Sequence, residues 1–146
     1  MRKSEIAEVQ PKYKRKNMSG VPSIKSSKDC NEVLKVFFTD ITYKEQFFIM
    51  LLDRANNVLG VSKVSEGGCS GTVVDGKIIF QTALISNAQA IILCHNHPSG
   101  QLYPSTSDLN LTDKIRMFGE YIDIKVLDHL IITQDGYYSF ADEGKI

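Results

Sequence analysis

The sequence predicts a single α/β domain in which three helices surround five or six strands. The chain has 146 residues, which is the usual length of one domain. Hydrophobic residues make up 42% of it and charged residues 23%, as in ordinary globular proteins. Apolar residues recur at helical spacing in some segments and form short continuous runs in others, which indicates that helices and strands alternate along the chain.

The first half predicts a helix, a hairpin and a second helix. The helix covers residues 28–38, where four apolar residues share one face: Cys30, Val33, Leu34 and Phe37. The apolar run at 47–52 and the extended segment at 58–64 predict a β-hairpin that turns at Asn56 and Asn57. A second helix is expected over residues 76–87, capped by Asp75, with three residues facing the core: Ile79, Ala83 and Leu84.

The second half predicts a buried strand, a helix and a group of strands. Residues 90–94 are all apolar, which is typical of a central strand buried on both faces, and this strand runs directly into His95. A helix begins at Ser105 and continues to Gly119. Extended runs at 122–127 and 129–133 precede a turn and a short strand at 137–140.

Charge divides the chain into an arm and a domain. The 17 basic and 17 acidic residues cancel, which argues against a chain that binds nucleic acid over its whole surface. Residues 1–30 hold 8 basic and 3 acidic side chains, so they carry +5 while the remainder carries −5. Residues 1–22 are therefore predicted to form a flexible basic arm, and residues 23–146 the domain. The arm could contact phosphates, or it could serve only as a solubilising tail.

The cysteines and the apolar runs indicate a cytoplasmic protein. Cys30, Cys69 and Cys94 lie far apart and form no Cys-x-x-Cys pair, so we expect reduced thiols and no thiolate zinc site. The longest apolar run, residues 47–52, is too short to span a membrane, and the N-terminus shows no secretory signal.

The residues that predict chemistry follow the central strand. Alternate residues of an extended chain point the same way, so His95 and His97 can direct two imidazoles at one point. Asp108 lies in the first turn of the next helix and could supply a third ligand. Three protein ligands with a fourth position left for water are typical of a catalytic zinc site. The alternatives are that the histidines are surface loop residues, and that Ser105 and Asp108 only form a capping box.

The spacing from His95 and His97 to Ser105 and Asp108 resembles the JAMM signature of MPN (JAB) zinc metalloproteases. Two segments are similar to sequences of the RadC-like branch of this family: His-Asn-His-Pro-Ser-Gly at 95–100 and Asp-His-Leu-Ile-Ile at 128–132. The resemblance covers most of the chain. It implies a mixed sheet flanked by helices, of the cytidine-deaminase-like kind, and a zinc ion held by two histidines and an aspartate.

The resemblance also implies catalytic residues and an activity. It places the general base at Glu45, which opens the strand before a Leu-Asp pair, with Glu66 as the reserve candidate. It gives Ser105 the role of donating a hydrogen bond to the oxyanion. The implied protein is a zinc-dependent hydrolase of peptide or isopeptide bonds, from a family associated with DNA repair.

Three neighbouring residues are expected to play structural roles. Cys94 points away from His95 on the strand and should pack in the core. His129 lies in an apolar run and is expected to be a buried histidine or a hydrogen-bond partner of a ligand, not a ligand itself. Asn96 is expected to shape the turn after the strand, as is Ser99.

Other functions stay open on the sequence alone. A zinc deaminase needs His-x-Glu and Pro-Cys-x-x-Cys, and the sequence contains neither. A metal-dependent nuclease or a DNA-repair accessory protein remains an alternative, because the basic arm could contact the phosphates of DNA or bind a repair-protein partner. The helix-hairpin-helix region common in RadC-like proteins is not expected in the short charged stretch before Gly20, which weakens the case for direct DNA binding. A non-catalytic MPN-type binding module is the third alternative.

Overall fold

The computed structural model describes residues 7, 9–14, 19–67 and 73–146. These residues form one mixed sheet flanked by helices, so the predicted fold class is confirmed. The α-helices and strands of the described chain are α1 (Ser27–Leu34), β1 (Gln46–Leu52), β2 (Val58–Glu66), α2 (Gly76–Ile85), β3 (Ala90–Asn96), α3 (Thr106–Tyr121), β4 (Lys125–Ile132) and β5 (Tyr137–Ser139).

The sheet has the strand order β2-β1-β3-β4-β5, with the predicted β1–β2 hairpin at one edge. Strands β3 and β4 are parallel, and α3 forms the crossover between them, while every other pair is antiparallel. The fully buried strands β1 and β3 lie in the interior of the sheet, as a strand covered on both faces requires.

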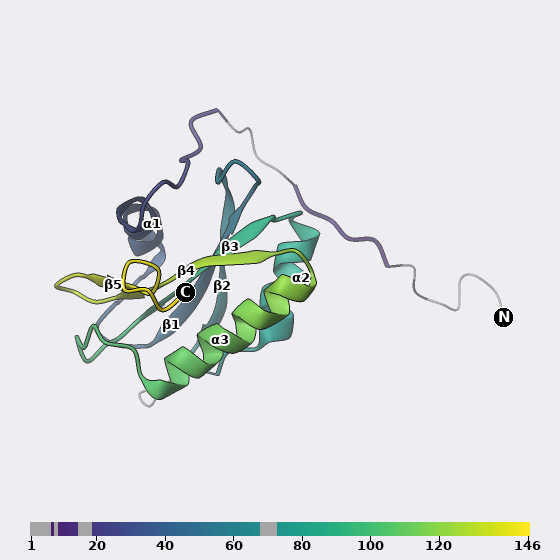
Figure 1. Ribbon diagram of the computed structural model, residues 1–146. Coiled ribbons are helices and arrows are strands. Elements are labelled where there is room, and N and C mark those ends of the chain that lie inside the picture. Colours follow the sequence, from purple (N-terminus) through teal and green to yellow (C-terminus); the bar gives the residue numbers. More distant parts are fainter. Residues whose placement is uncertain (1–6, 8, 15–18, 68–72) are drawn as a thin grey trace.

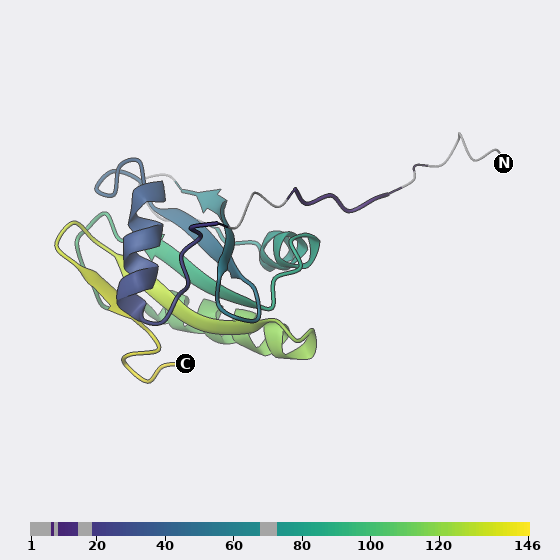
Figure 2. The ribbon, with the colours of Figure 1, turned by 90° about the horizontal axis from the view of Figure 1, so that it is seen from above.

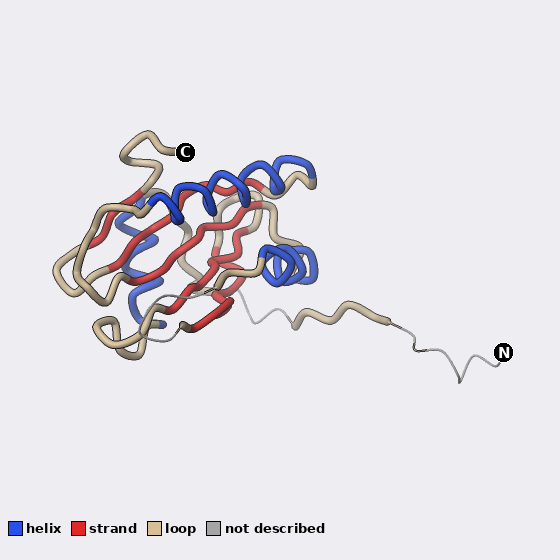
Figure 3. Tube along the Cα trace, turned by 90° about the horizontal axis from the view of Figure 1, so that it is seen from below, coloured by secondary structure: helices blue, strands red, loops and turns tan. Residues whose placement is uncertain are grey.

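Each face of the sheet is covered by its own helices, as Figures 1, 2 and 3 show: α2 and α3 pack on one face, and α1 packs on the other. Side chains alternate along a strand, so β3 supplies Ile91 and Leu93 to the first face and Ile92 and Cys94 to the second. His95 continues the first set and therefore points toward the side of α3. Cys94 is fully buried in the opposite core, as predicted.

Polar side chains begin the helices where the sequence predicts them. The Asp75 carboxylate accepts a hydrogen bond from the Lys77 amide at 2.9 Å and caps α2. The Ser105 hydroxyl accepts one from the Asp108 amide at 3.1 Å and caps α3. These bonds satisfy amides that have no partner inside the helix, which fixes where each helix starts.

Three local predictions were wrong. Leu84 is 56% exposed and not in the core, because the buried face of α2 is centred on Ile79, Phe80 and Ala83. The first helix tightens into a 3₁₀ turn at Lys35–Phe37, which leaves Phe37 41% exposed. The two strands expected at 122–127 and 129–133 are the single strand β4.

Described residues within 1–22 contact the domain. The Tyr13 hydroxyl donates to the Leu59 carbonyl at 2.9 Å, and the Pro22 carbonyl accepts from the Val58 amide at 3.0 Å. The prediction of a flexible arm over 1–22 rests partly on Arg15 and Lys16, which lie outside the described residues. Cys69, one of the three cysteines considered in the sequence, also lies outside them. None of the helices in the described part of the chain is both long and apolar enough to cross a bilayer.

Candidate metal centre

The two histidines are held at the end of β3. His95 is the sixth residue of the strand, 1% exposed, and its ring stacks on Phe47 of the neighbouring strand with 5.8 Å between centroids. His97 follows the strand, and its amide donates to the Ile132 carbonyl at 3.1 Å. The paired strands on either side thus fix the direction in which both imidazoles point.

A tight turn orients the His97 ring. The Gly100 amide donates to the His97 carbonyl at 3.0 Å, and Gly100 has φ +79°, a conformation that favours glycine. The turn brings the Gln101 carbonyl to 2.7 Å from His97 Nδ1. A carbonyl oxygen can only accept, so Nδ1 carries the proton and Nε2 of the uncharged ring offers its lone pair. Ser99 shapes this turn as predicted, since its hydroxyl accepts from the Gln101 amide at 3.4 Å.

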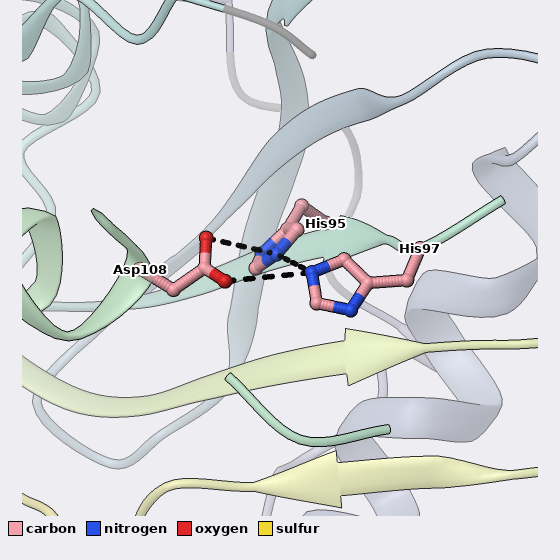
Figure 4. Close-up of side chains that lie close together, drawn as sticks. All are labelled: His95, His97 and Asp108. Atoms are coloured by element: carbon pink, nitrogen blue, oxygen red, sulfur yellow. Dashed lines mark hydrogen bonds and ion pairs between the residues drawn. The ribbon is translucent and has the colours of Figure 1, made fainter. Parts of the chain in front are cut away.

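Helix α3 supplies the carboxylate. Asp108 closes a capping box with Ser105, whose amide and hydroxyl donate to Asp108 Oδ2 at 2.7 and 2.6 Å. Asp108 therefore has the capping role considered from the sequence, and it also contacts the histidines. The two hydrogen bonds from Ser105 go to Oδ2, and the other oxygen, Oδ1, lies 3.3 Å from His95 Nε2. The capping box thus fixes the carboxylate so that Oδ1 faces His95 and Oδ2 faces His97 (Figure 4).

The spacing of the three side chains fits a tetrahedral zinc ion. His95 Nε2 and His97 Nε2 are 2.9 Å apart, and His97 Nε2 lies 3.4 Å from Asp108 Oδ2. Zinc bonds of about 2.0–2.1 Å place tetrahedral ligands roughly 3.3 Å from one another. The candidate ligand atoms all lie within 4.8 Å of one another, and this is the one such group of His, Cys, Asp or Glu found among the described residues.

The charges of the cluster favour a bound cation. Burial opposes ionisation of Asp108, but its close contacts with His95 and His97 outweigh burial and hold the pKa of the carboxyl well below its usual range. The hydrogen bond with Asp108 raises the pKa of His97. The site therefore stabilises a positive charge at His97 Nε2, where either a proton or a metal ion could sit.

Glu45 and Glu66 occupy different places. Glu45 directly precedes β1 and lines a cleft of about 760 Å³ with His95, His97 and Asp108. Glu66 is not among the residues that line this cleft; its carboxylate is 2.9 Å from Lys63 Nζ and 3.8 Å from Lys44 Nζ. The hydrogen bond from Lys63 lowers the pKa of Glu66. The geometry thus favours Glu45 over Glu66 as a group that can reach a substrate in the cleft.

Asn96 has a role that the sequence did not reveal. It lies between the two histidines on β3 and points to the opposite side, where it is fully buried. Its Nδ2 donates to the carbonyls of Ile41 and Lys44 at 2.8 Å each, and its Oδ1 accepts from the Gln46 amide at 2.7 Å. These bonds tie the segment that carries Glu45 to the strand that carries the histidines, beyond the turn-shaping role expected for Asn96. Its partners lie 50 to 55 residues away in sequence, so a local sequence motif could not predict these hydrogen bonds.

His129 lies behind the cluster, as predicted, and not in it. It is fully buried, and its Nε2 is 2.8 Å from His95 Nδ1. Burial lowers the pKa of His129 well below its ordinary value. Ser105 lines the same cleft as Glu45, and its hydroxyl donates to Asp108 in this structure. Its expected contact with an oxyanion stays a prediction and requires that hydroxyl to rotate.

Comparison with known sequences identifies the family. The sequence model of the RadC-like JAB domain matches residues 24–145. The chain is 45% identical over 121 residues to a UPF0758 protein of Flavobacterium johnsoniae, an alignment that covers 83% of this chain and 52% of that protein. A UPF0758 protein of Porphyromonas gingivalis is 38% identical, with 84% of this chain and 54% of the relative covered. One from Thermotoga maritima is 32% identical, with coverages of 85% and 53%.

The chain spans about half the length of these relatives, and the family model covers the whole sheet and the histidine and aspartate cluster. The resemblance seen in the motif is therefore confirmed: the chain belongs to the RadC-like JAB domain family.

Proposed function

We propose that this chain is a zinc-dependent hydrolase of amide bonds, acting on a peptide or isopeptide. The observation that carries the proposal is the convergence of His95, His97 and Asp108 at distances that suit one tetrahedral ion. Two imidazoles and one carboxylate are a ligand set that zinc accepts in catalytic sites. All three side chains line the same cleft, so an ion that they held would be accessible to a substrate or to water.

The chain's own residues would divide the work. His95 and His97 would hold the ion through Nε2, and Asp108 through Oδ1, the oxygen outside the capping box. A bound zinc ion supplies Lewis acidity, which polarises a carbonyl and lowers the pKa of water from about 15.7 toward about 7.

Glu45 would accept the proton of the attacking water and then pass it to the leaving amine. One carboxylate can serve both steps, as general base and then as general acid. Its support is its place in the cleft, anchored through the adjacent Gln46 amide. Ser105 would donate to the oxyanion of the tetrahedral intermediate. The buried free thiols Cys30 and Cys94 suit action in the reducing cytoplasm.

The test compares hydrolysis of a peptide library, isopeptide-linked peptides and single-stranded DNA by the zinc-loaded chain. We expect cleavage of an amide substrate, and a loss of about 10²- to 10⁴-fold in Glu45→Gln. Glu66→Gln is the matched control and should keep its activity, because Glu66 pairs with lysines outside the cleft.

Three results would contradict the proposal in whole or in part. Metal-dependent cutting of DNA without amide cleavage would favour a nuclease, with phosphates bound by the basic residues of the arm. Bound zinc without cleavage of any of these substrates would favour a binding module. Full activity in Glu45→Gln would remove Glu45 from the mechanism.

A further inference from the structure

We propose that Thr112 and His129 are positioning residues that fix the tautomer of His95, so that its Nε2 always offers a lone pair to the metal. This inference rests on the proposed metal site and explains how the protein prepares it. The four groups form one hydrogen-bonded series: His95, His129, Thr112 and the backbone carbonyl of Asp108.

The series has a fixed direction because it ends on a carbonyl. Thr112 Oγ1 lies 2.6 Å from the Asp108 carbonyl oxygen and 2.6 Å from His129 Nδ1. The carbonyl can only accept, so the single hydroxyl proton of Thr112 points to it. If the hydroxyl pointed to His129 instead, two oxygen lone pairs would face each other at 2.6 Å. Thr112 must therefore accept from His129, and the proton of His129 sits on Nδ1.

The direction then passes from one ring to the next. An uncharged imidazole with its proton on Nδ1 has a bare Nε2, so His129 Nε2 can only accept. It lies 2.8 Å from His95 Nδ1, which must therefore carry the proton and donate it. When the His95 ring is uncharged, the same rule leaves its Nε2 bare, on the side that faces His97 and Asp108. One backbone carbonyl thus determines, through a hydroxyl and an imidazole, which atom of His95 can bind a metal.

Aromatic rings keep the series rigid and dry. His129 is fully buried and stacks on Phe140, with 4.7 Å between centroids and 18° between ring planes. Phe47 packs edge-to-face with His129, with 5.6 Å between ring centroids, and also stacks on His95. Thr112 is 2% exposed. A buried imidazole between two apolar rings favours the uncharged form, and neither ring can rotate freely in this packing.

The arrangement also links two of the proposed ligands. The series begins on the ring of His95 in β3 and ends on the backbone of Asp108 in α3. Thr112 lies one helical turn after Asp108, so its hydroxyl reaches the Asp108 carbonyl from inside the same helix. The hydrogen bonds thereby fix the position of His95 on the strand relative to Asp108 on the helix, without any contribution from a bound ion.

The first test needs no variant and no metal. Long-range ¹⁵N–¹H correlation of the histidine rings in the metal-free protein reports which nitrogen carries each proton. We expect the Nδ1–H tautomer for His129. Finding the proton of uncharged His129 on Nε2 would overturn the proposal, because His95 Nδ1 would then have to accept.

The second test measures zinc affinity by competition with a chelator. Thr112→Val keeps the volume and removes the hydroxyl, whereas Thr112→Ser keeps the hydroxyl. We expect zinc affinity to fall about 10- to 100-fold in Thr112→Val and to stay within about threefold of wild type in Thr112→Ser. His129 of Thr112→Val should also lose its strong preference for the Nδ1–H form. Equal zinc affinity in the Val and Ser variants would refute the role of Thr112.

The two tests distinguish failure of the positioning role from failure of the proposed function. If the wild-type chain binds no zinc, the proposed hydrolase fails, while the tautomers of the metal-free protein still decide on the series. If wild type binds zinc and His129 holds its proton on Nε2, the metal site stands and the positioning role falls. Should Thr112→Val fail to fold, the ring spectra of the wild-type protein decide between the two tautomers by themselves.

Discussion

Replacing Asn96 by aspartate should loosen the segment that carries Glu45 while leaving the metal ligands in place. The Asn96→Asp variant keeps an oxygen that can accept from the Gln46 amide, but it loses both donations to the carbonyls of Ile41 and Lys44. Each net hydrogen bond contributes about 1 kcal/mol, so the local opening free energy should fall by at least about 2 kcal/mol. That corresponds to roughly a thirtyfold larger opening equilibrium.

Native-state hydrogen exchange of the Gln46 amide measures this opening directly. We expect it to exchange about thirtyfold faster in Asn96→Asp, with the Leu93 amide in β3 as the reference for global unfolding. Asn110→Asp makes the same chemical change on the exposed side of α3 and should leave Gln46 unaffected. Unchanged Gln46 exchange in Asn96→Asp would show that the Asn96 side chain does not anchor this segment.

Two further predictions concern the packing of the domain interior. Gly119→Ala should lower the free energy of unfolding measured by urea denaturation, because the added Cβ would collide with the Ile124 carbonyl. Alanine favours a helix over glycine by about 1 kcal/mol, so helix propensity alone predicts the opposite change. A variant more stable than wild type would contradict the collision. Burial raises the pKa of Cys30 to about 12 and that of Cys94 well above its usual value. In a Cys69→Ser background, a thiol reagent at about pH 8 should therefore label neither Cys30 nor Cys94 until the protein unfolds; rapid labelling of the folded protein would refute their burial.

Local patterns predicted the elements that position the site. The apolar run at 90–94 identified the central strand, and alternation along it predicted that His95 and Cys94 face opposite sides. The Ser105 and Asp108 spacing predicted the start of α3. These features depend on residues within one turn or one strand, so the sequence expresses them directly.

Features that depend on distant contacts were missed. Asp128 looked like a break between two strands, but β4 continues through it. Its carboxylate accepts from Ser139 Oγ at 2.6 Å and from the Ala141 amide at 3.0 Å, beyond the following turn. The hydrogen bonds of the Asn96 side chain and the contact of Thr112 with His129 also join separate elements. Such partners become visible only when the sheet and helices are assembled.

The metal content of the purified chain tests the central claim most directly. After equilibration with zinc and removal of the excess, elemental analysis should find about one ion per wild-type chain and far less in the double variant His95→Ala, His97→Ala. Asp108→Asn should also lose zinc, whereas Asp113→Asn, on the exposed side of the same helix, should keep it. Equal zinc content in the wild-type chain and the double variant would contradict the assignment of the site.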